Sequence, residues 1–95
     1  MVKVLAHFYF KDDALAEVQT LAQELISATR REEGCLQYEL LQAQKEALHF
    51  VMQEAWASQT ALEAHFATEH FTRIVPLLAG LCTQPPAVEK YTQFM

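Results

Sequence analysis

Four histidines are the side chains of this sequence best suited to moving protons at neutral pH: His7, His49, His65 and His70. Their unperturbed proton affinity lies near neutrality, as general acid–base catalysis requires. We take His65 and His70 as the candidate catalytic bases, with a structural or surface role as the alternative for each histidine. The two are five residues apart across a predicted helix break, which is not the i, i+4 spacing of a helical metal pair. No Cys or carboxylate completes a ligand set in the sequence pattern, so we expect no metal site.

A second group consists of aromatic side chains that are large enough to enclose a small molecule: Tyr38, Phe50, Trp56, Phe66 and Phe71. Glu54 shares a parity with Phe50 and Trp56 in a predicted strand. A carboxylate on an apolar face requires a hydrogen-bonding partner or an aqueous pocket. An apolar cavity with few polar groups is typical of a ligand site, so we predict that Glu54 and the five rings bind substrate. An ordinary aromatic core or a dimer interface explains each ring equally well.

Composition excludes several classes of function. The chain has 95 residues and a net charge of −5, and its seven Lys and Arg residues form no cluster, so we expect no nucleic-acid partner. Two glycines cannot build a phosphate-binding loop, and neither a CxxC nor a GxSxG motif is present. No apolar run reaches the roughly 18 residues that span a membrane. The first residues read as a strand rather than an export signal, so we expect a cytoplasmic protein.

Hydrophobic periodicity predicts seven elements in one domain over residues 1–95. Apolar residues alternate with a period of two in the strands and recur with the helical period in the helices. The predicted strands cover 2–10, 35–40, 49–56 and 88–94, and the predicted helices cover 13–32, 59–67 and 69–81.

Local signals mark the ends of these elements. Asp12 or Asp13 is positioned to cap the first helix, and the left-handed conformation is expected at Gly34. The same pattern places Arg30 in the last turn of that helix. Pro76 lies inside the third helix and is expected to kink it or to start a fresh turn.

Three blocks of the sequence resemble the antibiotic biosynthesis monooxygenase (ABM) domain family. RREEGCLQYEL at 30–40 resembles the stretch R-x-E-x-G-C-L-x-Y-E-L, and FVMQEAW at 50–56 resembles the strand F-x-x-x-E-x-W. LEAHF at 62–66 and EHF at 69–71 resemble the helical stretches L-x-x-H and H-F. The blocks occur in order and at similar spacing over nearly the whole chain, which makes them specific for the family but not for one activity.

The resemblance implies a ferredoxin-like α+β fold with a four-stranded antiparallel sheet covered by helices on one face. It also implies a homodimer whose two sheets form an α/β barrel. Similar proteins oxygenate polycyclic phenols or quinols without metal, flavin or haem, and others degrade haem or isomerise a phosphorylated signalling sugar. The haem-degrading branch has an Asn on its first strand, and none occurs there in this sequence, so we do not expect haem degradation.

Our leading hypothesis is a cofactor-independent monooxygenase that oxidises a small phenol, quinol or anthrone with O₂. His65 or His70 would remove a proton, while the aromatic set would shape the cavity and exclude water. The alternatives are an isomerase of a small phosphorylated sugar and a non-catalytic, dimeric ligand-binding or stress-related module. The isomerase requires cations near the pocket, and Arg73 is the cation nearest to the two histidines in sequence.

Overall fold

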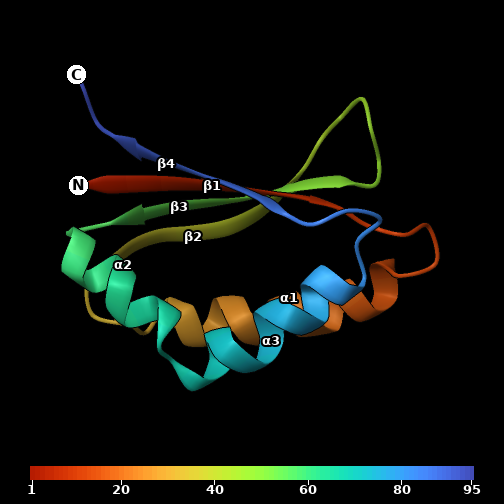
Figure 1. Ribbon diagram of the computed structural model, residues 1–95, viewed down its shortest axis with the longest axis horizontal. Helices are drawn as coiled ribbons and strands as arrows, with labels where there is room; N and C mark the ends of the chain where they lie inside the picture. Colours follow the sequence, from red (N-terminus) through yellow and green to blue (C-terminus); the bar gives the residue numbers. More distant parts are fainter.

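The computed structural model describes all residues, 1–95, and contains the seven predicted elements in the predicted order. They are β1 (Val2–Tyr9), α1 (Leu15–Thr29), β2 (Cys35–Gln42), β3 (His49–Trp56), α2 (Gln59–Phe66), α3 (Glu69–Gly80) and β4 (Ala87–Thr92). The four strands form one sheet in the order β2-β3-β1-β4, and every neighbouring pair is antiparallel. All three helices lie on one face of this sheet (Figure 1). The predicted ferredoxin-like α+β fold is confirmed.

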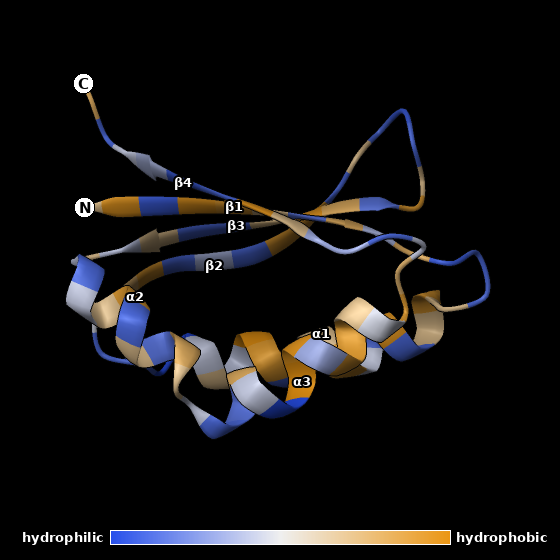
Figure 2. Cartoon of the chain, viewed as in Figure 1, coloured by the Kyte–Doolittle hydropathy of each residue, from blue (hydrophilic) through white to orange (hydrophobic).

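Buried and partly exposed residues alternate along β1, which shows which face of the sheet the helices cover. Val4, Ala6 and Phe8 are buried, whereas the residues between them are partly exposed. Since successive side chains of a strand point to opposite faces, the apolar parity faces the helices. Figure 2 shows the hydrophobic stretches of β1 above the hydrophobic positions of the helices. The core therefore lies between one face of the sheet and the inner sides of α1 and α3.

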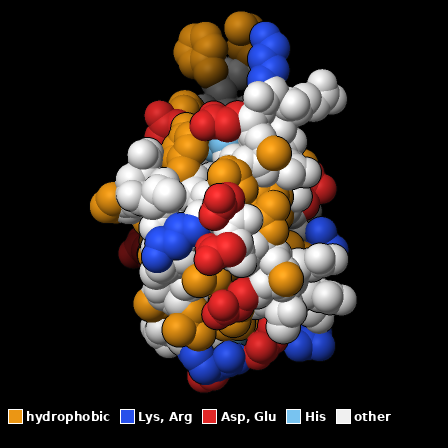
Figure 3. Space-filling view, turned by 90° about the vertical axis from the view of Figure 1, so that its right-hand side faces the viewer, with side chains coloured by type: hydrophobic (Ala, Val, Ile, Leu, Met, Phe, Trp, Pro, Cys, Tyr) orange, Lys and Arg blue, Asp and Glu red, His pale blue; other side chains and the backbone are white.

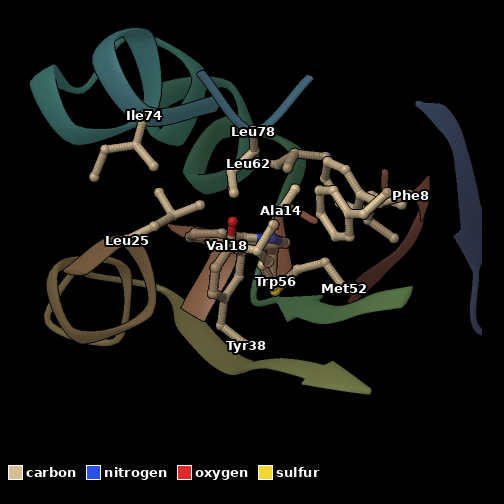
Figure 4. Close-up of a cluster of buried hydrophobic side chains, with 13 residues drawn as sticks. Phe8, Ala14, Val18, Leu25, Tyr38, Met52, Trp56, Leu62, Ile74 and Leu78 are labelled. Carbon is tan, nitrogen blue, oxygen red and sulfur yellow. The ribbon is translucent and has the colours of Figure 1, made fainter. Parts of the chain in front are cut away.

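This core has a large aromatic side chain at its centre. Trp56 is fully buried at the end of β3, and it packs with Tyr38 of β2 and Leu62 of α2 in a cluster of thirteen buried residues (Figure 4). The helices contribute aliphatic side chains to the same cluster, including Leu25 from α1 and Ile74 from α3. Aromatic side chains of the strands and aliphatic side chains of the helices thus form one continuous core.

The first helix is shorter than its apolar stripe predicts. It begins at Leu15 after Ala14, which makes no side-chain cap, so the prediction of a cap from Asp12 or Asp13 is wrong. Arg30 follows the helix instead of lying in its last turn. Its Nε donates to the carbonyl of Tyr38 at 2.9 Å. This hydrogen bond ties the end of α1 to β2 and gives the arginine a role other than stabilising the helix dipole.

Pro76 does not interrupt the third helix. α3 runs from Glu69 to Gly80 with Pro76 inside it, so no fresh turn begins there. Its inner side chains, Ile74 and Leu78, are both buried in the core. Burial of this apolar side favours a continuous helix despite the missing proline N–H.

The opposite face of the sheet is not covered by any element of the chain. The edge strand β4 is exposed at all six of its residues. Large hydrophobic residues on the uncovered face include Leu41 and Tyr91, each more than two-fifths exposed. The side of the molecule seen in Figure 3 shows Lys and Arg scattered among acidic and hydrophobic side chains, without a basic patch. No helix of this fold is long and apolar enough to cross a membrane.

Candidate functional site

The two candidate bases meet on one carboxylate. Oε2 of Glu32 lies 2.7 Å from Nδ1 of His65 and 2.6 Å from Nε2 of His70. His65 belongs to the last turn of α2, His70 to the first turn of α3, and Glu32 to the connection between α1 and β2. The expectation that no carboxylate completes a ligand set with the two histidines is therefore wrong. Sequence spacing gave no sign of Glu32, because it precedes the histidines by 33 and 38 residues.

A glycine allows the connection that carries Glu32 to approach α2. Gly34 has a φ of +85°, as the sequence predicts, and this left-handed conformation is rarely adopted by residues with a Cβ. A Cβ at position 34 would lie only 2.6 Å from the Cβ of Ala61 in α2. Ala61 is one helical turn before His65, so the close approach brings Glu32 beside that imidazole.

A threonine links the two helices that carry the histidines. The hydroxyl of Thr68 donates to the carbonyl of His65 at 2.8 Å and accepts from the N–H of Phe71 at 3.3 Å. The first bond satisfies a carbonyl at the end of α2, and the second caps α3. This short connection holds His70 in the first turn of α3 beside the end of α2.

The protonation of His65 follows from its partner and its burial. An ionised carboxylate only accepts hydrogen bonds, so Nδ1 of His65 carries the proton and donates to Glu32. The other ring nitrogen, Nε2, is buried and has no hydrogen-bond partner. Burial lowers the pKa of His65 and outweighs the hydrogen bond to Glu32, which acts in the opposite direction. The side chain is therefore a neutral imidazole with a free acceptor nitrogen.

Aromatic rings surround this imidazole. The ring centroid of His65 lies 4.6 Å from that of Trp56, 5.4 Å from Tyr38 and 5.0 Å from Phe71. Phe66 lies 6.0 Å from His65 and 5.3 Å from Phe71. Trp56 and Tyr38 are fully buried, whereas Phe66 and Phe71 are partly exposed. The structure therefore brings four of the five predicted rings around the candidate base, with two of them on the solvent side.

The predicted partner for Glu54 is present in the same strand. Oε1 of Glu54 accepts a hydrogen bond of 3.0 Å from Nε1 of Trp56. The strand register places Glu54 between Val4 of β1 and Tyr38 of β2 on the helix-covered face. Burial raises the pKa of Glu54 to about 7, and the bond from Trp56 opposes this rise. The carboxyl consequently titrates near neutrality while it fixes the indole ring against His65.

Tyr38 is a neutral hydrogen-bonding group in this enclosure. Burial raises the pKa of Tyr38 far above its usual range, and the charge of Glu54 raises it further. The phenol therefore keeps its proton at any physiological pH and can donate it in a hydrogen bond. A developing oxyanion on a bound molecule is the acceptor that such a donor stabilises best.

Phe50 lies apart from the other predicted rings. It packs edge-on against Phe10 at a centroid distance of 5.5 Å, at the opposite end of β3 from Trp56. There it lines a groove of about 830 Å³ between α1 and the β2–β3 side of the sheet. Arg30 is the one cation and Glu39 the one carboxylate of this groove. None of the other predicted site residues lines it.

The sequence as a whole matches a known family. The family described as antibiotic biosynthesis monooxygenase matches residues 1–77. The chain belongs to the antibiotic biosynthesis monooxygenase family. Its solved relatives include a structure described as an antibiotic biosynthesis monooxygenase, with a TM-score of 0.94, 41% identity and 100% of both chains covered. The structure of Rv0793 from Mycobacterium tuberculosis has a TM-score of 0.92 and 29% identity, over 99% of this chain and 95% of that one.

Similar sequences give the coarse function. This ABM-family chain is 35% identical to "Putative monooxygenase YcnE" of Bacillus subtilis, over 90% of each protein. It is 31% identical to "Putative monooxygenase Rv0793", over 92% of this chain and 85% of the relative. It is also 29% identical to sll1783 of Synechocystis, of whose length it spans 61%. The two relatives named as putative monooxygenases support a monooxygenase-like function and leave the substrate open.

Proposed function

We propose that this protein is a cofactor-independent monooxygenase that oxidises a small phenol, quinol or anthrone with O₂. The observation that carries the proposal is the free, buried Nε2 of His65, whose other nitrogen is held by Glu32 inside an aromatic shell. Membership of a family with monooxygenase relatives supports the reaction class. The substrate supplies all four electrons that reduce O₂. One oxygen atom enters the substrate, and the other leaves as water.

The first step is proton removal by His65. A substrate hydroxyl donates to Nε2, and its proton passes to the imidazole while Nδ1 remains bonded to Glu32. The carboxylate then stabilises the imidazolium that forms, as a buried carboxylate does beside a catalytic histidine. His70 donates to the same oxygen and fixes the position of the carboxylate, so we assign it a positioning role.

The aromatic shell performs the remaining tasks. The anion of the substrate is electron-rich and reacts with O₂ once water is excluded. Tyr38 donates a hydrogen bond to the substrate oxygen, and Glu54 holds Trp56 against the reacting ring. Phe66 and Phe71 are the half-buried members, so their side chains must move outward to admit the substrate. Phe50 contributes to the separate groove and takes no part in this step.

A phosphorylated sugar is a poorer fit to the same cluster. No Lys or Arg forms an ion pair with Glu32, whose charge partners are the two histidines. Arg73, the cation nearest in sequence, is engaged by Glu24 and Glu69. Lys90 lies beside the aromatic shell, with its Nζ 5.9 Å from the centre of the Phe66 ring, and is the cation that a phosphate group near His65 would have to recruit.

The test measures O₂ consumption with a panel of quinols and anthrones. We expect His65→Gln to abolish turnover and His70→Gln to reduce kcat, whereas His49→Gln, on the other face of the sheet, leaves the rate unchanged. Circular dichroism establishes that each variant is folded. Wild-type rates in His65→Gln and His70→Gln would remove both histidines from the mechanism. Tight binding of the aromatic compounds without turnover would favour the non-catalytic ligand-binding module instead.

We also propose that the working form is a homodimer. The uncovered face of the sheet carries Leu5, Leu41, Val51 and Tyr91, and apolar side chains of this kind need a partner surface. Light scattering is expected to give twice the mass of the chain at micromolar concentration. A monomer mass at that concentration would refute this assembly.

A further inference from the structure

The Glu32 cluster has a set of donor atoms that proton transfer does not fully use. Oε2 of Glu32, Nδ1 of His65 and Nε2 of His70 all lie within 4.8 Å of one another. We propose that these three atoms bind one divalent transition-metal ion of the Zn²⁺ type per chain. This inference goes beyond the proposed oxygenase function and does not depend on it.

The donor chemistry selects the class of ion. Two imidazole nitrogens and one carboxylate oxygen form a set typical of three-ligand zinc sites, which keep a fourth position for water. Imidazole nitrogen suits Zn²⁺, Co²⁺ or Fe²⁺, whereas Mg²⁺ and Ca²⁺ prefer sites built from oxygen alone. Three ligands from three separate segments also meet here without a fourth protein group that would close the site.

The charge of the cluster favours a cation. The side chain of Glu32 is 13% exposed, and no Lys or Arg is paired with it. Its partners are imidazoles, and the side chain of His65 is only 1% exposed, which favours its neutral form. The carboxylate of Glu32 therefore lies in a partly buried place without a Lys or Arg beside it. A divalent cation would compensate this charge more fully than two hydrogen bonds do.

The geometry requires a small expansion. Zinc bonds of about 2.0–2.1 Å to nitrogen and oxygen place tetrahedral donor atoms about 3.3 Å apart. The present separations from Glu32 are 2.7 Å to His65 and 2.6 Å to His70, so they would widen by about 0.6 Å and about 0.7 Å. Glu32 lies in a connection, and His70 lies in the first turn of its helix with a side chain 17% exposed. The exposed edge of His70 supplies the entry path and the water ligand.

Metal binding would oppose the proposed proton transfer. When Nδ1 of His65 binds the ion, the neutral ring carries its proton on Nε2 and cannot accept one from a substrate. Zn²⁺ is therefore expected to inhibit substrate oxidation, with an inhibition constant equal to its dissociation constant. Because binding can be measured without any substrate, the metal site and the oxygenase function can fail independently.

The experiment titrates chelator-treated protein with Zn²⁺ at pH 7 by calorimetry and with Co²⁺ by visible absorption. We expect one ion per chain and the absorption bands of tetrahedral or five-coordinate Co²⁺. Glu32→Gln and His70→Ala should each weaken binding by at least roughly tenfold, since each removes a ligand. His70→Ala alters a partly exposed side chain, so it provides a folded variant if Glu32→Gln does not fold.

Two controls exclude other ligands. His49→Ala removes the histidine pair on the opposite face of the sheet, and Cys35→Ser removes the free thiol nearest to Glu32 in the chain. Both variants should keep the affinity and stoichiometry of the wild type. Binding that survives in both Glu32→Gln and His70→Ala, or that disappears with His49→Ala or Cys35→Ser, would overturn the proposal. So would the lack of any saturable binding at micromolar Zn²⁺.

Discussion

The chain contains two pairs of histidines on opposite faces of its sheet. His65 of α2 and His70 of α3 meet through the carboxylate of Glu32 on the helix-covered side, at 2.7 and 2.6 Å. His7 and His49 contact each other directly on the uncovered face, with 3.0 Å between Nδ1 of the first and Nε2 of the second. Residue type and pairing are similar in the two places. The carboxylates beside them and the depth of burial are different.

The two histidine pairs differ in how far their neighbouring carboxylates are exposed to solvent. Glu32 is 13% exposed, whereas the side chains of Glu89 and Glu46, beside the surface pair, are 53% and 63% exposed. Electrostatic interactions weaken as solvent surrounds the charges, so surface ion pairs contribute little. His49 also stacks on Tyr9 at 4.4 Å, which gives it an ordinary packing role. A histidine becomes a candidate base here because its carboxylate is enclosed, not because it is paired.

The largest expected effect is a difference in kcat between variants of the enclosed carboxylate, Glu32, and the exposed one, Glu89. Glu32→Gln keeps the shape of the side chain but removes the charge that stabilises the imidazolium of His65. We expect kcat for quinol oxidation to fall by about 100-fold or more, the usual scale for impaired acid–base catalysis. Glu89→Gln should change kcat by less than about twofold, because its charge is solvated. The comparison fails if both variants lose activity equally or if neither does.

The next effect is a difference in the free energy of unfolding between variants of the buried His65 and the partly exposed His49. His65→Ala leaves a cavity between Trp56 and Phe71 and removes one partner of Glu32, so we expect it to lower the free energy of unfolding by about 3 kcal/mol. His49→Ala alters a partly exposed side chain and should cost less than about 1 kcal/mol. Urea denaturation at pH 7 measures both values. Similar losses would show that burial does not distinguish the two pairs.

A smaller, pH-dependent effect tests the second buried carboxyl. The ordinary pKa of 4.5 and the folded pKa of about 7 for Glu54 mean that the folded state holds this proton more tightly than the unfolded chain. Its contribution to stability is therefore fully present below pH 4.5 and is lost as the pH rises to about 7, by at most about 3 kcal/mol. Above pH 7 the loss is complete.

The variant Glu54→Gln isolates this contribution. It should remove that part of the pH dependence and keep an acceptor for the N–H of Trp56, while Glu89→Gln should leave the pH dependence as it is. Urea denaturation between pH 4 and 8 gives the difference between wild type and variant. A difference that does not change with pH would show that Glu54 titrates normally.

Short-range patterns in the sequence determined the elements and their faces. Alternation predicted a strand with Val4, Ala6 and Phe8 on one mainly apolar face, and the structure shows that this face meets the helices. The left-handed conformation at Gly34 followed from its place after a helix. The need of Glu54 for a partner was also evident, because its neighbours on the same strand face are apolar. These features depend on residues a few positions apart, so local physical chemistry is enough to predict them.

The site depended on contacts between distant segments. Trp56, His65 and Phe71 could be named as candidates, but no pattern showed that Glu32 would join the two histidines or that Phe50 would lie in a separate groove. The start of α1 was also missed, because Ala14 stands at the N-cap and no side chain caps the helix. The tertiary structure decided which titratable side chains lie together in a buried place, namely Glu32 with His65 and His70. That depends on how the connection after α1 packs against α2, which no single segment of the sequence encodes.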